Sequence, residues 1–328
     1  MGYALGQLQG LGGKGGVSMH TDFFYPSKGV GKVHACRGSP EQPPVAIVQI
    51  IHGIAEHVER YQDFAQYLNR LGYLVVAEDH MGHGKTINGG GIQGYFRGGW
   101  FTAVDDSYAL LQSTRREFPE LPYFLFGHSM GSFMTRTILC KYPNSGISGA
   151  ILCGTGWQPK AVLSTGIAAC EAFCKIQGEK TPSRALERLV FSGYNQKVEH
   201  PKTAYDWLTR DSRIVEAYLS DPLCGFTPTA GLMRDMLKGI RFIQAPRSLF
   251  AMKNDLPVFF IAGGDDPVGS YGKGVLRAAD AFRSAAMADV SCKIYPLGRH
   301  EILNEINKEE VYQDVAAWLE KKRLAPGK

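Results

Sequence analysis

A serine in a glycine-flanked turn is the residue of this sequence best placed to do chemistry. Ser129 lies in Gly127-His128-Ser129-Met130-Gly131, a G-x-S-x-G pattern. The pattern alone is weak, but an apolar run precedes it and an amphipathic segment follows it, which predicts a sharp strand-to-helix turn. Such a turn strains the serine backbone, exposes the hydroxyl and requires small residues two positions before and after. We therefore expect a nucleophile elbow built from Gly127, His128 and Gly131 around Ser129.

A serine hydroxyl is a poor nucleophile at neutral pH, so it needs a base, and the base needs an orienting carboxylate. Where this turn occurs, the chain order is serine, acid, histidine. Only His200 and His300 lie downstream of Ser129. His200 lies in a helical region beside Pro201, whereas His300 follows the last expected strand in a loop ahead of a helix. We therefore expect His300 to be the base.

Two adjacent aspartates compete for the role of the acid. Asp265 and Asp266 directly follow a buried strand, and either one could instead form a turn or cap a helix. Pro267 would hold Asp266 rigid, so we prefer Asp266 as the acid and Asp265 as the turn residue. Residue types alone separate the two only weakly.

A tetrahedral intermediate of acyl transfer needs two backbone N–H donors aimed at its oxyanion. One is expected from Met130, the residue after the nucleophile, and the other from the loop His52-Gly53-Ile54. Gly53 would allow a close backbone approach, and Ile54 is the expected donor. His52 and His57 could also suggest a metal pair, but their spacing of five and the lack of a nearby third ligand disfavour it. We expect neither a metal nor a cofactor.

The elements that must position these residues alternate between short apolar strands and amphipathic helices. This alternation predicts an α/β fold with a mostly parallel, doubly wound sheet and helices on both faces. The expected strands are 22–25 and 32–36, which form a leading hairpin, and then 45–51, 74–79, 123–127, 149–154, 256–263 and 291–296. The expected helices are 61–71, 101–118, 131–142, 273–288 and 308–323.

A block of helical patterns without a convincing strand interrupts the alternation at residues 155–248. Its helices are expected at 161–176, 183–194, 214–219 and 229–242. It is interpreted as a cap inserted between two parts of the core, 19–154 and 249–328, over the strand ends where such sheets bind ligands. Its apolar side chains form either the core of the cap or an acyl-chain pocket, and we give both interpretations equal weight: Phe173, Tyr205, Trp207, Met233 and Met236.

Five motifs occur in the order typical of one family: HGIAEHVERY (52–61), DHMGHGKT (79–86), GHSMGS (127–132), GGDDPVG (263–269) and GRHEILNE (298–305). Over residues 20–325 the chain resembles the monoacylglycerol lipase and lysophospholipase group of the α/β-hydrolase fold, also called serine aminopeptidase S33. Residues 206–226 resemble bacterial members in particular. The resemblance implies that Ser129 is the nucleophile, Asp266 the acid and His300 the base. It also implies Ile54 and Met130 as oxyanion donors.

The resemblance implies a cofactor-free serine hydrolase of carboxylic esters whose substrate is a small, lipid-like acyl ester. One alternative is an aminopeptidase or amidase, which needs an anionic pocket for the substrate amine, and the HGGPG-like loop of proline iminopeptidases is absent. A second alternative is a ligand-binding module that has lost turnover, against which the complete triad argues. The cap is a candidate for peripheral membrane contact. The sequence predicts neither the oligomeric state nor the preferred acyl chain and head group.

Composition excludes several other classes of protein. With 328 residues, 44% hydrophobic and 20% charged, the chain has the values of a globular protein. The net charge of +5 comes without a block of like charges, so we expect no nucleic-acid partner. Seven cysteines without a C-x-x-C pair argue against a disulfide framework and a structural zinc site. The most apolar stretch, 45–51, contains Gln49 and is too short to span a bilayer, and a cytoplasmic location is expected.

The first 16 residues contain seven glycines, without the basic and apolar regions of a secretory signal. A tract of this kind buries too little apolar surface to offset its ordering entropy. Residues 14–16 can be encoded by codons that resemble a bacterial ribosome-binding site, at a suitable distance before Met19. We therefore interpret residues 1–18 as a disordered or non-native leader, translated upstream of a native start at Met19.

Overall fold

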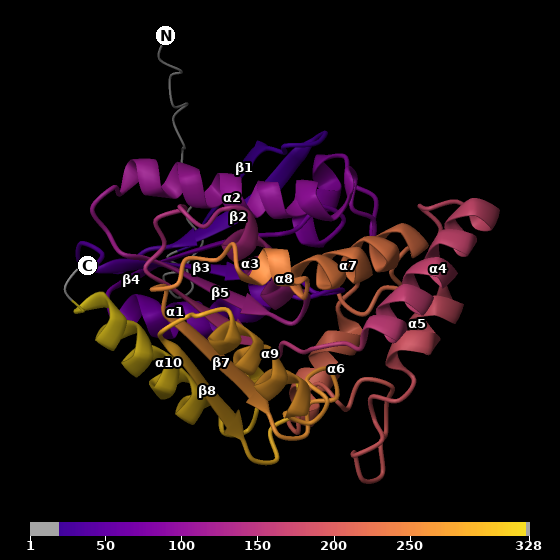
Figure 1. The fold of residues 1–328 in the computed structure, drawn as a ribbon. Helices are drawn as coiled ribbons and strands as arrows, with labels where there is room; N and C mark the ends of the chain where they lie inside the picture. The colour runs from indigo at the N-terminus through magenta and orange to yellow at the C-terminus, as the bar shows by residue number, and fades with distance from the viewer. Residues whose placement is uncertain (1–19, 326–328) are drawn as a thin grey trace.

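The chain forms an eight-stranded sheet between two layers of helices, as the computed structural model shows (Figure 1). The structure describes residues 20–325, so the proposed leader at 1–18 lies outside the described residues. The sheet order is β1-β2-β4-β3-β5-β6-β7-β8. β2 is antiparallel to both of its neighbours, β1 and β4, and the other pairs are parallel, which confirms the predicted fold class. The strands are β1 (His20–Pro26), β2 (Lys32–Gly38), β3 (Ala46–Ile51), β4 (Tyr73–Glu78), β5 (Tyr123–His128), β6 (Gly149–Cys153), β7 (Val258–Gly263) and β8 (Val290–Tyr295).

The central strands are buried on both faces, which is why they appear in the sequence as continuous apolar runs. Every residue of β3 is buried. Val48 and Ile50 pack into the core on one side of the sheet, and Ile47 and Ile51 pack into the core on the other side. The parallel register pairs Ile51 at the end of β3 with Gly127 near the end of β5. This register brings the loop after β3 next to the turn after β5.

Helices cover the sheet from both sides and match the predicted positions within a few residues. α1 (Gln62–Arg70) and α10 (Lys308–Arg323) pack on one face, and α2 (Gly99–Glu117), α3 (Met130–Lys141) and α9 (Lys273–Ser284) pack on the other. The expected extension of the helix that starts at residue 273 to residue 288 is wrong. α9 stops at Ser284, and Ala286 then adopts a left-handed φ of 64° while Ala285 and Met287 turn into the core. The sequence has no glycine or proline near Ser284 that would predict this end of the helix.

Five helices occupy the segment between β6 and β7; α4 and α5 lie at one side of the sheet, and α7 leads back from them to α8, which lies beside α3 (Figure 1). α7 packs against α4 as well as against α2 and α3 of the core, which anchors the segment to the sheet layer. Within residues 155–248 the only bridge between extended residues joins Pro182 to Thr229. The five helices are α4 (Lys160–Gln177), α5 (Arg184–Phe191), α6 (Ser212–Ser220), α7 (Ala230–Ile243) and α8 (Pro246–Leu249).

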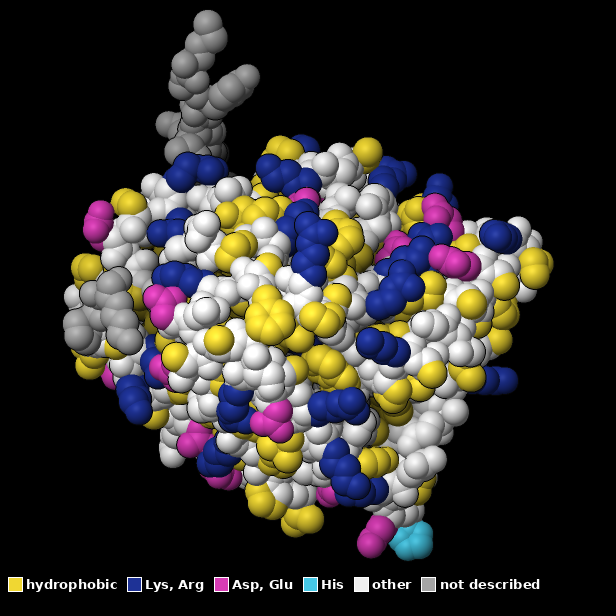
Figure 2. Space-filling view, viewed as in Figure 1, with side chains coloured by type: hydrophobic (Ala, Val, Ile, Leu, Met, Phe, Trp, Pro, Cys, Tyr) yellow, Lys and Arg dark blue, Asp and Glu magenta, His cyan; other side chains and the backbone are white. Residues whose placement is uncertain are grey.

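Three short 3-10 helices follow strands or precede helices and were not predicted: η1 (Val58–Tyr61), η2 (Gly84–Gly89) and η3 (Ile302–Asn304). On the face shown in Figure 2, basic side chains are interspersed with acidic and apolar ones. None of the helices in residues 20–325 combines the length and apolar character needed to cross a membrane.

Candidate active site

Ser129 lies between β5 and α3 in a backbone conformation that few non-glycine residues adopt. Its φ is 52° and its ψ is −121°. Its N–H donates to the carbonyl of Cys153 at 2.9 Å. A Cβ atom on Gly127 would lie 2.5 Å from the Gly131 carbonyl oxygen, and one on Gly131 would lie 1.9 Å from the Ile51 oxygen. The turn therefore requires both glycines of the G-x-S-x-G pattern.

A buried histidine and a buried aspartate meet beside this turn. His300 Nδ1 donates to Asp266 Oδ1 at 3.0 Å, and both side chains are almost fully enclosed. The same Oδ1 atom accepts the N–H of Val268 at 2.8 Å, which fixes the carboxylate. Gly154 has a φ of 59°, and a Cβ atom there would lie 3.0 Å from His300 Cε1, so this glycine leaves room for the ring.

The neighbouring aspartate points elsewhere. Asp265 Oδ1 lies 3.2 Å from Lys197 Nζ, and its side chain is 31% exposed. The structure therefore brings Asp266, and not Asp265, to His300. His200, the other downstream histidine, is exposed in the segment after α5 and does not line the cavity that His300 lines.

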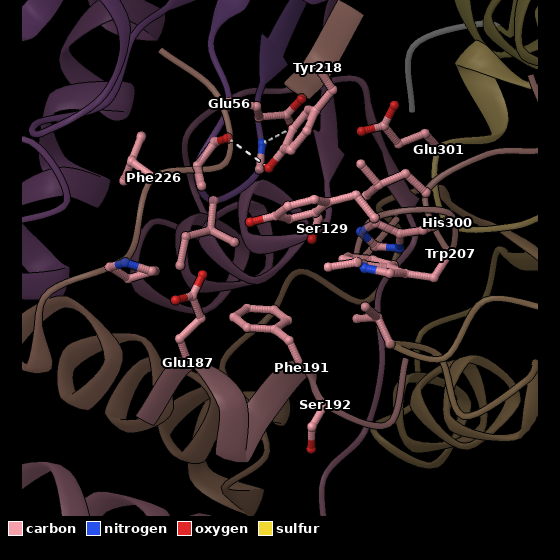
Figure 3. A pocket seen from close by; sticks show the side chains of 18 of the residues that line it. Glu56, Ser129, Glu187, Phe191, Ser192, Trp207, Tyr218, Phe226, His300 and Glu301 are labelled. Carbon is pink, nitrogen blue, oxygen red and sulfur yellow. Dashed lines mark hydrogen bonds between the residues drawn. The ribbon is translucent and has the colours of Figure 1, made fainter. Parts of the chain in front are cut away.

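Ser129 and His300 line one cavity of about 380 Å³ and lie close to each other in its wall (Figure 3). Across residues 20–325 no hydrogen bond joins the Ser129 hydroxyl to the His300 ring. Catalytic contacts of this type commonly tighten only when a substrate is bound. With Nδ1 donating to Asp266, the Nε2 atom of His300 has a free lone pair in the neutral ring, and this atom can accept a proton.

The loop after β3 borders the same cavity. Gly53 and Ile54 line it, and a Cβ atom on Gly53 would lie 3.1 Å from Ser129 Cβ. Met130 is the first residue of α3, where helix N–H groups have no intrahelical partner. In the described part of the chain the N–H groups of Ile54 and Met130 donate to no protein acceptor. Both are therefore available for a substrate oxygen.

Two buried histidines, His52 and His80, fix the conformation of this loop through hydrogen bonds. His52 Nδ1 donates to the carbonyl of Gly53 at 2.7 Å, and its Nε2 accepts the N–H of His80 at 3.1 Å. His80 Nε2 in turn donates to the His52 carbonyl at 3.0 Å, and the two rings stack at 3.9 Å. Burial lowers the pKa of His80 to about 3 and lowers that of His52 as well. Both rings are therefore neutral at pH 7, as these hydrogen bonds require.

A buried charge network connects the loops of the site, and the sequence analysis did not identify it. Arg60 lies between Glu56, at 2.8 Å, and Glu301, which it contacts twice at 2.6 Å. Glu56 Oε1 also accepts the Gly53 N–H at 2.5 Å and contacts His128 Nδ1 at 3.2 Å. The network therefore links the loop after β3, the elbow residue His128 and the segment after His300.

The charges of this network are set by their pairing. Burial by itself would raise the pKa of Glu56, but the hydrogen bond from His128 and the charge of Arg60 hold that pKa well below its usual value. Burial would lower the pKa of His128, yet Glu56 raises it above the usual value. The sequence did contain a signal for this network. Glu56 and Arg60 lie in the motif HGIAEHVERY and Glu301 lies in GRHEILNE, each within a few positions of an expected site residue.

The segment 155–248, for which we keep the name cap, supplies most of the remaining cavity wall. Its aromatic side chains, together with Arg184, Glu187 and Arg188 of α5, line the cavity. Of the five apolar insert residues that could form either a core or an acyl-chain pocket, Tyr205 and Trp207 line the cavity. The other three pack into the hydrophobic core that the insert shares with one face of the sheet. The aromatic lining consists of Phe191, Tyr205, Trp207, Tyr218 and Phe226.

The order of the strands in the sheet is that of an α/β-hydrolase, and so is the strained serine at the turn after the central strand β5. Comparison with known families is more specific. Residues 42–307 match the Hydrolase_4 family, described as serine aminopeptidase, S33. The chain belongs to this family, as the motifs predicted.

Similar proteins cover nearly the whole chain. A monoacylglycerol lipase of Mycolicibacterium smegmatis is 30% identical over 288 residues, which is 86% of this chain and 90% of that protein. A monoglyceride lipase of Mus musculus is 27% identical over 292 residues, 88% of this chain and 86% of that protein. The crystal structure of a carboxyl esterase from Bacillus coagulans in complex with glycerol has a TM-score of 0.87 at 29% identity and covers 94% of this chain and 100% of its own.

Proposed function

We propose that this protein is a carboxylic ester hydrolase that cleaves monoacylglycerols or lysophospholipid-like acyl esters with Ser129, His300 and Asp266 as a catalytic triad. One observation carries the proposal. His300, which is paired with the buried Asp266, lines the same cavity as the strained Ser129. The similarity to monoacylglycerol lipases and to a carboxyl esterase supports ester hydrolysis as the reaction.

The reaction proceeds through an acyl-enzyme. His300 Nε2 takes the proton of the Ser129 hydroxyl as its oxygen attacks the acyl carbonyl, and Asp266 stabilises the imidazolium that forms. The imidazolium then donates this proton to the leaving alcohol oxygen, and the ester C–O bond breaks. In the second half, His300 deprotonates a water molecule that attacks the acyl-serine, and the imidazolium then returns this proton to the Ser129 oxygen as the acyl C–O bond breaks and the carboxylic acid leaves.

Developing negative charge is stabilised by backbone donors. The N–H groups of Ile54 and Met130 are placed to donate to the carbonyl oxygen as it becomes an oxyanion. The bond from the Gly53 N–H to the buried Glu56 carboxylate orients the loop that carries Ile54. Because these donors are fixed before the substrate arrives, little reorganisation is needed during the reaction.

The cavity suits a lipid-like acyl chain. Its volume of about 380 Å³ and its aromatic lining are typical of sites that enclose an apolar ligand. Exposed apolar side chains on the cap helices α4 and α5 support peripheral contact with a lipid surface: Val162, Ile176 and Leu189. We also propose a cytoplasmic location, as we expected from the sequence.

The family description also favours an aminopeptidase or amidase as a second candidate. That activity needs a free carboxylate in the cavity for the substrate amine. Glu56 and Glu301 both line the cavity but are paired with Arg60, and Glu187 accepts a hydrogen bond from the Thr227 hydroxyl. The pairing of Glu56 and Glu301 with Arg60, and the positive charges of Arg184 and Arg188 beside Glu187 on α5, make an amine pocket a weaker candidate than an ester site.

The test combines active-site labelling with a substrate panel. We expect a fluorophosphonate probe to label the wild type and to spare Ser129→Ala. p-Nitrophenyl esters of increasing chain length should be hydrolysed by the wild type only, whereas aminoacyl anilides should not be cleaved. Labelling that persists in the alanine variant would exclude Ser129 as the nucleophile. Saturable ligand binding without product release would favour a ligand-binding module.

A further inference from the structure

A second cluster of reactive side chains lies outside the triad, where the cap meets the loop after β3. His57 comes from the residue before η1, and Asp221 and Cys224 come from the turn after α6. His57 Nε2 lies 2.8 Å from Asp221 Oδ2. One imidazole nitrogen, one carboxylate oxygen and the Cys224 sulfur all lie within 4.8 Å of one another.

The turn presents its two side chains in a fixed orientation. The N–H of Cys224 donates to the Asp221 carbonyl at 3.0 Å and closes the turn. The N–H of Leu223 donates to Asp221 Oδ1 at 2.8 Å, so Oδ2 is the oxygen left to face His57. The turn that carries Asp221 and Cys224 is therefore held by backbone hydrogen bonds, and Asp221 in turn contacts the His57 ring.

Burial of the cluster is uneven. His57 is 5% exposed and Cys224 is 7% exposed, whereas the Asp221 side chain is 32% exposed. An ion could enter from the side of the carboxylate and keep a water molecule there as a fourth ligand. Three protein ligands and one water is the usual arrangement of an open zinc site.

We propose that His57, Asp221 and Cys224 bind a zinc ion. A thiolate, an imidazole and a carboxylate together match the ligand preferences of Zn²⁺ better than those of Mg²⁺ or Ca²⁺. Binding releases the Cys224 thiol proton to solvent and forms a Zn–S bond. The proton on His57 Nε2 moves to Nδ1 through solvent exchange, so that the Nε2 lone pair replaces its hydrogen bond to Asp221 with a Zn–N bond.

The ion would join two parts of the proposed active site. The carbonyl of Ala55 accepts the Gly225 N–H at 2.9 Å and the Tyr218 hydroxyl at 3.0 Å, so this cap turn already contacts the loop that carries Ile54. A zinc ion between His57 and the turn would cross-link the same two segments. A ligand that binds only the folded chain raises its stability, so excess Zn²⁺ should raise the Tm.

The experiment uses the full chain without an affinity tag and stripped of metal. We expect titration with Co²⁺ to produce the charge-transfer absorption of a thiolate–cobalt bond, and Zn²⁺ titration calorimetry to give one equivalent per chain. Cys224→Ser should lose the absorption band and weaken Zn²⁺ binding by at least about tenfold. Cys174→Ser, which changes a cysteine on α4 outside the cluster, should retain both.

A wild type that shows no thiolate–cobalt band would overturn the proposal, and so would a band that persists in Cys224→Ser. If Cys224→Ser fails to fold, Asp221→Asn provides a second test. It should keep the band, because the thiolate remains, but should weaken Zn²⁺ binding. Unchanged Zn²⁺ affinity in Asp221→Asn would exclude the carboxylate as a ligand and overturn the three-ligand site.

Discussion

At the scale of single residues, two neighbouring aspartates have opposite environments. Asp266 is fully buried and accepts hydrogen bonds from His300 and from the Val268 N–H. Asp265 is partly exposed and pairs with Lys197. A carboxylate that orients a catalytic histidine must be fixed against it, and an exposed ion pair contributes little. The chemical difference between these adjacent positions therefore comes entirely from the surrounding fold.

This difference gives a matched pair of variants. We expect Asp266→Asn to lower kcat by about 10⁴-fold, because an amide favours the wrong tautomer of the histidine. Asp265→Asn should change kcat by less than about twofold, since it removes only a surface ion pair. Steady-state hydrolysis of a p-nitrophenyl ester measures both. Equal losses in the two variants would contradict the assignment of Asp266 as the acid.

Two glycines near the site differ in the space around them. A Cβ atom on Gly131 would lie 1.9 Å from the Ile51 carbonyl oxygen, whereas one on Gly264 would meet nothing closer than 3.4 Å. We expect Gly131→Ala to destabilise the protein by about 3 kcal/mol, because neither backbone segment can move without disturbing the elbow. Gly264→Ala should be within about 0.5 kcal/mol of the wild type. Thermal unfolding of both variants checks this, and a normal Tm for Gly131→Ala would contradict the close packing.

At the scale of elements, α5 places two arginines at the cavity, and these bear on the head group of the substrate. Arg184 and Arg188 lie one helical turn apart, are exposed and line the cavity. Their guanidinium groups suit a phosphate, which lysophospholipids carry and monoacylglycerols lack. The aromatic lining of the cavity suits either acyl chain equally well. The helix therefore provides a test that separates the two substrate classes.

We expect the double variant Arg184→Gln/Arg188→Gln to reduce kcat/KM for a lysophospholipid by at least about tenfold and to leave that for a monoacylglycerol nearly unchanged. Arg247→Gln on α8, an exposed arginine outside the cavity, serves as the control. The comparison of kcat/KM for the two substrates gives the result. An equal change in kcat/KM for both substrates would show that the two arginines do not distinguish the head groups.

At the scale of the whole molecule, one buried acid makes stability depend on pH. Glu78 at the end of β4 contacts Gln49 and Ser107 inside the core, and burial raises its pKa to about 8. A raised pKa in the folded state means that stability is complete below the unfolded value of 4.5 and falls as pH rises through 8. The protonated acid can donate to the Ser107 hydroxyl, and a glutamine could do the same without titrating.

Glu78→Gln should therefore be more stable than the wild type wherever the pH lies clearly above 4.5. At pH 7 the expected gain in the free energy of unfolding is roughly 3 kcal/mol, and it should disappear near pH 4.5. Denaturant unfolding at pH 5, 7 and 8 measures it. Glu199→Gln, an exposed residue of the cap, should leave the profile unchanged. A constant difference between Glu78→Gln and wild type across this range would mean that Glu78 does not titrate on unfolding.

The sequence by itself determined the positions of the strands and of the longer helices, and the serine turn, because these depend on local chemistry. Strands buried on both faces appear as continuous apolar runs, and the G-x-S-x-G spacing reflects steric limits at the elbow that involve neighbouring residues. The predicted end of α9 was wrong because no local stop signal ends the helix. The chain turns there because Ala285 and Met287 become buried.

Only the tertiary structure decided which groups meet across long distances in the chain. Arg60 and Glu301 are 241 positions apart, and His57 meets Asp221 across 164 positions. No periodicity encodes such pairings, because they arise when the sheet register and the cap bring separate loops together. The same reason explains why the sequence could rank Asp266 over Asp265 only weakly. The environment that distinguishes them, His300 on one side and Lys197 on the other, exists only in the folded chain.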